Sequence, residues 1–202
     1  MAEATETVRW YFNDLIAVYT HTLEAMRRHA VDESLLKVPG GKEAINSAVA
    51  TLELHLKKLE ERVNEMGGPG AVGQMKEAMT SVTGFLTGLY GQVRNQAASR
   101  ILRDDYTGLS FLMTCSTMLH TTCIALGNTR ASETTSQLVN ELPRVIIGIS
   151  NLLPKAVIAD LEHASARGEY VDELARCLLH NPLPQMNEPL PAGNPPPITG
   201  PE

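Results

Sequence analysis

A helical repeat of apolar side chains crosses residues 103–128 and limits the folds open to this chain. Its inward positions recur in steps of three and four residues, which places them on one side of a helix. They are Tyr106, Leu109, Leu112, Met113, Ser116, Leu119, His120 and Cys123. The polar residues 103–105 are expected to open this helix, and Gly127 and Asn128 to close it in a left-handed conformation. The segment predicts a core helix of an all-α bundle.

Two earlier segments carry the same repeat. A first helix is predicted from Thr5, an N-cap candidate, to about Ala30, and a second from about Lys42 to Met66, after the helix-breaking residues 38–41. The inward positions of the first helix are Val8, Tyr11, Leu15, Val18, Tyr19, Thr22 and Met26. Those of the second helix are Ile45, Val49, Leu52, Leu56, Leu59 and Val63.

The remaining helical segments complete a four-helix bundle with one extra helix. Residues 71–99, rich in small side chains, are expected to form a connecting helix between the two halves of the bundle. A last bundle helix should begin near Ser132 and continue to Val157. Because proline removes a backbone donor, Pro143 and Pro154 are expected to bend this helix or to split it.

The C-terminal region differs in composition from the rest of the chain. Residues 1–165 are assigned to the bundle and 166–180 to a short C-terminal helix, while 181–202 contain eight of the twelve prolines. Such a segment cannot propagate a helix or a sheet, so an extended, proline-rich tail is predicted. The tail either solubilises the protein or lies as an arm on a partner or neighbouring subunit.

Charge and composition argue against several classes of function. The formal net charge is −6 and no basic stripe is interleaved with aromatic residues, so a nucleic-acid partner is not expected. The most apolar run, residues 139–158, contains Glu141, Arg144, Lys155 and two prolines, which argues against a membrane span. The three cysteines are an odd number without CxxC spacing, and the N-terminal residues do not form a secretory signal. A cytoplasmic location is therefore expected.

A family resemblance rests on the third helix. The order Arg103-Asp104-x-Tyr106, then an amphipathic helix, then Ala-Leu-Gly at 125–127 resembles the third helix of bacterial stress-induced ferritin-like proteins. The resemblance covers residues 6 to about 165 and implies a ferritin-like four-helix bundle. In that family glutamates on the inner helix faces help to hold two iron or manganese ions.

The positions that this resemblance assigns to metal ligands hold other residue types. Leu109 and Leu112 stand three and six residues after Tyr106, and hydrocarbon cannot ligate a hard cation. Thr22 stands three residues after Tyr19, where the family has a glutamate. A threonine there is expected to satisfy its hydroxyl on a backbone carbonyl one turn back. Lys57 and Lys58 follow the pair His55-Leu56, where the family has acids, and their ammonium groups would repel a cation.

The function expected from these residues is non-catalytic, with no cofactor. The favoured interpretation is a bundle without its dimetal site that acts as an oligomeric scaffold or as an accessory subunit, binding protein through its surface and C-terminal tail. The first alternative is a di-iron or manganese ferritin-like oxidoreductase or iron-handling stress protein, whose ligands would have to come from Glu24, Glu53, His55, His120 and Glu141. The second alternative is a binder of a small apolar ligand in the bundle cavity.

Overall fold

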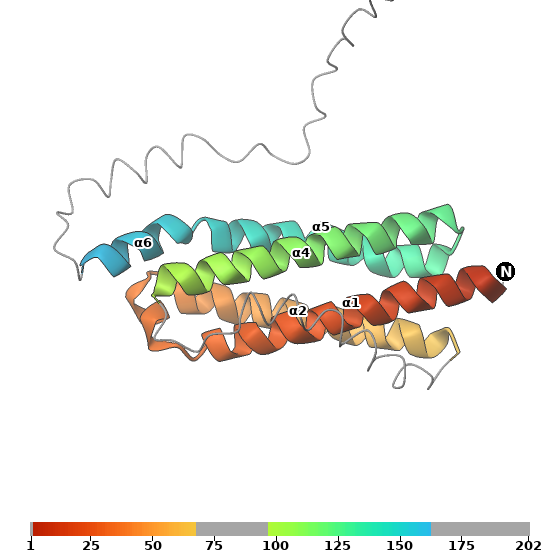
Figure 1. Ribbon diagram of the computed structural model, residues 1–202, viewed down its shortest axis with the longest axis horizontal. Coiled ribbons are helices and arrows are strands. Elements are labelled where there is room, and N and C mark those ends of the chain that lie inside the picture. The colour runs from red at the N-terminus through yellow and green to blue at the C-terminus, as the bar shows by residue number, and fades with distance from the viewer. Residues whose placement is uncertain (1, 68–96, 163–202) are drawn as a thin grey trace, which may run out of the picture. The chain divides into compact units, whose positions relative to one another are not determined.

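The computed structural model describes residues 2–67 and 97–162, and their regular structure is helical (Figure 1). The long helices are α1 (Ala2–His29), α2 (Gly41–Glu65), α4 (Ala98–Ala125) and α5 (Thr129–Ser150), with the short helices η1 (Glu33–Lys37) and α6 (Leu153–Glu162). No β-strand occurs within these two ranges, which confirms the prediction of an all-α class. Most of the connecting helix predicted over residues 71–99 lies outside the described residues, as do the predicted C-terminal helix at 166–180 and the tail at 181–202.

The four long helices pack around a common core. Helix α1 packs against α2 and α4, helix α5 packs against α2 and α4, and α6 covers part of α4. Side-chain pairs show that neighbours are antiparallel. His29 near the end of α1 contacts Asp105 near the start of α4, whereas Asp14 lies near Cys115. Figure 1 shows the same opposite directions for α1 and α2 and for α4 and α5.

The inward faces of α1 and α4 follow the predicted repeat closely. On α4, all the predicted positions are at least half-buried, and Leu109 and Leu112 are fully buried. On α1, only Tyr11 among the predicted positions is half-exposed, and Phe12 takes a fully buried place beside the predicted stripe. Apolar spacing therefore located these two core faces correctly.

Helix α2 is rotated about its axis relative to the predicted face. Ala48 and His55 are buried, while Val49 and Leu56 are only half-buried. The prediction favoured the larger apolar residues at these two places. The imidazole of His55 enters the core instead because two other helices supply hydrogen-bond partners for it.

Two predicted helix starts are wrong. Helix α1 already begins at Ala2, so Thr5 lies inside the helix and is not its N-cap. Helix α4 begins at Ala98, so Asp104 and Asp105 are buried one to two turns inside it and do not form an opening polar turn. The first backbone N–H groups of α4 are instead bound by Asp160 of α6, whose carboxylate accepts from Ala98 N at 3.1 Å and from Ser99 N at 3.0 Å.

The turn between α4 and α5 agrees with the prediction. Gly127 adopts a left-handed conformation with φ of +67°, which ends α4 at little cost because glycine has no Cβ. Asn128 then caps α5, and its side-chain oxygen accepts from Ala131 N at 3.1 Å. Helix α5 begins at Thr129, three residues before the predicted start.

The two prolines of the last bundle segment behave differently. Helix α5 continues through Pro143, whereas the chain breaks at residues 151–152, just before Leu153 and Pro154 open α6. This confirms the predicted splitting, since proline is well tolerated in the first turn of a helix. By length and composition alone, Thr129–Leu161 would also suffice to cross a membrane. That is weak support for a span, because a core helix of a soluble protein meets the same criteria.

Candidate functional site

A chain of polar side chains crosses the interior of the bundle. Each long helix contributes one member: Ser116 from α4, Tyr19 from α1, His55 from α2 and Glu141 from α5. We call these four residues the core polar network. Tyr19, His55 and Ser116 are fully buried, whereas the Glu141 side chain is 42 % exposed. The network therefore runs from the core to the surface of α5.

The chemistry of the partners fixes the direction of each hydrogen bond. An ionised Glu141 carboxylate can only accept, so the 2.8 Å contact requires a proton on His55 Nε2. Neutral His55 then has a free lone pair on Nδ1, which accepts from the Tyr19 hydroxyl at 3.2 Å. Ser116 lies next to the Tyr19 hydroxyl, but its own hydroxyl oxygen makes no hydrogen bond. Hydrogen bonds therefore join Tyr19, His55 and Glu141, and Ser116 only packs beside them.

The protonation states follow from burial and charge. Burial lowers the pKa of His55, which favours the neutral imidazole, although Glu141 opposes this shift. The hydrogen bond from His55 lowers the pKa of Glu141, and the nearby charge of Lys58 lowers it further. Burial raises the pKa of Tyr19, so its hydroxyl stays protonated. All three residues are thus in the states that the hydrogen bonds require near neutral pH.

This arrangement is suited to joining helices and poorly suited to catalysis. Tyr19 and His55 have no exposed surface, so a substrate cannot reach the hydroxyl or the imidazole. The raised pKa of Tyr19 also makes its hydroxyl a weak nucleophile. Within the described residues, the hydrogen bonds of the network join α1, α2 and α5, and Ser116 of α4 packs beside Tyr19.

The predicted alternative metal donors do not converge. Of the five residues, only His55 and Glu141 are in contact, while Glu53 pairs with Arg27 at 2.6 Å and His120 contacts Thr135 at 2.9 Å. Glu24 is exposed. Residues 2–67 and 97–162 contain no group of three or more His, Cys, Asp or Glu side chains that could hold a metal ion.

The residues that stand where the family resemblance assigns metal ligands are of other types, and they differ in burial. Leu109 and Leu112 are fully buried in the hydrocarbon core, Lys57 is exposed and Lys58 is half-buried near His55 and Glu141. Thr22 is fully buried, but its hydroxyl has no hydrogen-bond partner. The expectation that this hydroxyl binds a carbonyl one turn back is therefore wrong for Thr22.

A second buried polar contact lies where the end of α1 meets the start of α4. His29 Nδ1 is 2.8 Å from Asp105 Oδ1, and the Asp105 carboxyl is fully buried. Burial raises the pKa of Asp105, and the hydrogen bond with His29 lowers it. The neighbouring Asp104 is bound by Arg103 at 2.6 Å. This contact fixes α1 against α4 away from the core polar network.

Comparisons with protein-family models, with curated proteins and with solved structures find no match to this chain.

Sequence reasoning identified His55 and Glu141 separately and placed Tyr19 and Ser116 on inward faces without giving them a polar role. The four residues belong to four different helices, so no local spacing connects them. The available signal was the presence of a tyrosine, a histidine and a serine at positions of otherwise apolar repeats, since buried polar groups need partners.

Proposed function

We propose that this protein is a non-catalytic, ferritin-like bundle that has lost the dimetal site and acts by binding other protein chains. The observation that carries the proposal is the complete engagement of His55. Its two nitrogens are taken by Tyr19 and Glu141, so the contact between His55 and Glu141 serves to join helices. A metal ion would have to displace both hydrogen bonds, and among residues 2–67 and 97–162 no third His, Cys, Asp or Glu side chain joins His55 and Glu141.

The helix arrangement supports the ferritin-like part of the proposal. The chain forms the antiparallel hairpins α1–α2 and α4–α5, and each helix of one hairpin packs against one helix of the other. Ferritin-like carboxylate proteins place glutamates and a Glu-x-x-His pattern on such inward faces. Here the corresponding inward places are held by Leu109 and Leu112, which are fully buried.

The surface supports a protein-binding role. Several large apolar side chains of the described helices are at least two-fifths exposed, and exposed apolar residues that cluster indicate interaction sites. They include Trp10, Met118, Ile124, Val157 and Leu161. A role for the C-terminal tail as a docking arm stays a prediction from the sequence.

The test is elemental analysis of the purified full chain after incubation with ferrous iron and, separately, with manganese. We expect background metal for the wild type and for His55→Gln. About two metals per chain in the wild type, lost in His55→Gln and Glu141→Gln, would replace the proposal by the dimetal alternative. Native mass spectrometry of the same sample distinguishes the other alternative, because a co-purified apolar ligand would add mass without metal.

A further inference from the structure

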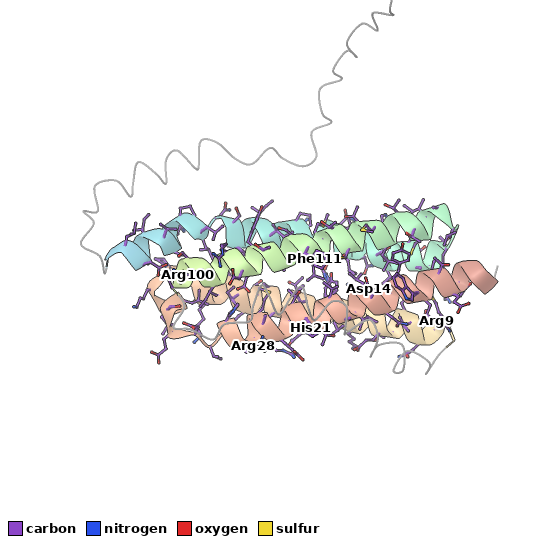
Figure 2. The ribbon with its side chains drawn as sticks, in the orientation of Figure 1. Arg9, Asp14, His21, Arg28, Arg100 and Phe111 are labelled. Atoms are coloured by element: carbon purple, nitrogen blue, oxygen red, sulfur yellow. The ribbon has the colours of Figure 1, made fainter. Side chains whose placement is uncertain are left out.

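The seam between α1 and α4 carries an apolar surface with one acid in it. We call Trp10 and Asp14 of α1, together with Phe111, Cys115 and Met118 of α4, the seam patch. Trp10 is 56 % exposed and Met118 is 54 % exposed, whereas Asp14, Phe111 and Cys115 are half-buried. Figure 2 labels Asp14 and Phe111 on the facing sides of α1 and α4.

Helix geometry brings these side chains together. Burial raises the pKa of the Cys115 thiol, and the negative charge of Asp14 contributes to this shift, which shows that the two side chains lie near each other. Since α1 and α4 are antiparallel, the residue one turn before Asp14 lies opposite the residue one turn after Cys115. Those residues are Trp10 and Met118, the two most exposed members. Trp10 is also held by an edge contact with Tyr11, with ring centroids 5.1 Å apart.

Asp14 is the feature that indicates the partner. Its carboxylate makes no hydrogen bond or ion pair with any described residue, and partial burial raises its pKa. A carboxylate that loses water without gaining a cation is destabilising. A cation delivered from outside would remove this penalty, while the surrounding side chains would bury apolar surface of the same partner.

We propose that the seam patch binds a helical protein segment that presents an arginine among apolar side chains, with the arginine pairing with Asp14. Arginine fits better than lysine because its planar guanidinium binds a carboxylate through two donors and stacks on an indole ring. Met118 is an adaptable contact for the apolar side chains of the segment. This inference rests on the proposed protein-binding function and specifies the chemistry of the partner.

Trp10 provides the measurement, because it is the only tryptophan in the chain. The probe is a synthetic amphipathic helical peptide of leucine and alanine with one central arginine, and its twin carries glutamine in place of that arginine. We expect a saturable change of Trp10 emission with the arginine peptide and binding about tenfold weaker with the twin. Asp14→Asn should weaken the binding of the arginine peptide by a similar factor and leave the binding of the glutamine twin unchanged.

The matched control is Glu60→Gln, which removes the same charge from an exposed position on α2. It should bind like the wild type. Equal weakening by Glu60→Gln and Asp14→Asn, equal binding of both peptides, or no saturable binding would each overturn the inference. Trp10 emission that changes on dilution without peptide would also overturn it, because the patch would then be covered by a second copy. None of these outcomes alters the metal measurement, so the proposed function is judged separately.

Discussion

His55 occupies the core because of two residues that are distant in the sequence. Its partners Tyr19 and Glu141 are 36 and 86 positions away. A local sequence pattern cannot connect residues with such separations. Apolar spacing instead predicted that Leu56, the residue next to His55, faces the core. The repeat could predict that α2 has an inward face, but the exact rotation of the helix depends on hydrogen bonds between helices.

Substitution His55→Gln tests the proton linkage of this residue. Burial lowers the pKa of folded His55, so below about pH 6.5 the unfolded chain takes up a proton that the folded chain resists. This group therefore makes stability fall as the pH decreases from about 7, until the folded imidazole also titrates. The lowered pKa of Glu141 acts in the same direction below about pH 4.5.

We expect His55→Gln to lose roughly 1–2 kcal/mol of unfolding free energy at about pH 7.5, and to lose less at about pH 5.5. The slope contributed by one proton cannot exceed about 1.4 kcal/mol per pH unit. Urea unfolding followed by circular dichroism at both pH values gives the difference between wild type and variant. If the unfolding free energy depended on pH identically in the wild type and in His55→Gln, the proton linkage assigned to His55 would be contradicted.

Thr22 offers a second test among single residues. Its buried hydroxyl has no partner, so Thr22→Val should raise the unfolding free energy by up to about 1 kcal/mol. Thr20→Val is the control, because the Thr20 hydroxyl does bind the Ile16 carbonyl at 2.8 Å, and this variant should not gain stability. Thermal and urea unfolding measure both changes. A marked loss of stability in Thr22→Val would mean that the hydroxyl is hydrogen-bonded in solution.

Among the elements, α4 shows most clearly what the sequence could predict. Its apolar repeat predicted both its inward face and the left-handed Gly127 at its end. The predicted start of α4 was wrong because aspartates such as Asp104 and Asp105 are typical of an exposed first turn. Both are buried, Asp104 against Arg103 and Asp105 against His29. The true start depends on Asp160, which lies about 60 residues further along the chain.

Asp160→Ala should therefore destabilise α4. The Asp160 carboxylate accepts from the first two N–H groups of this helix, where Ala97 offers no side-chain cap. Removing a capping carboxylate typically costs about 1 kcal/mol of unfolding free energy. Lys155→Ala on the exposed side of α6 is the control and should stay within about 0.5 kcal/mol. Equal stability of Asp160→Ala and wild type in urea would show that α6 does not cap α4.

At the scale of the whole bundle, hydrocarbon fills the inward places of Leu109 and Leu112, to which the ferritin-like resemblance assigns metal ligands. The burial of Leu109 and Leu112 could be predicted from the sequence because their inward positions follow from spacing, whereas their role as lost ligand positions stays a prediction from the resemblance. Sequence reasoning could not predict the core polar network, which exists only once α1, α2, α4 and α5 have packed together. The contacts of the buried polar groups therefore depend on how the helices pack together, whereas the inward apolar positions can be read from the spacing within each helix.

The proposed absence of a dimetal site can be tested by introducing one carboxylate with Leu112→Glu. In a bundle that has kept the rest of a dimetal site, added iron or manganese would stabilise this variant. Here the new charge would be buried without a partner, so we expect a loss of at least about 3 kcal/mol that neither metal restores. Leu112→Met keeps the volume and should cost less than about 1.5 kcal/mol. Recovery of Leu112→Glu by metal in thermal unfolding would instead mean that further ligands surround Leu112 and that the bundle can still assemble a metal site.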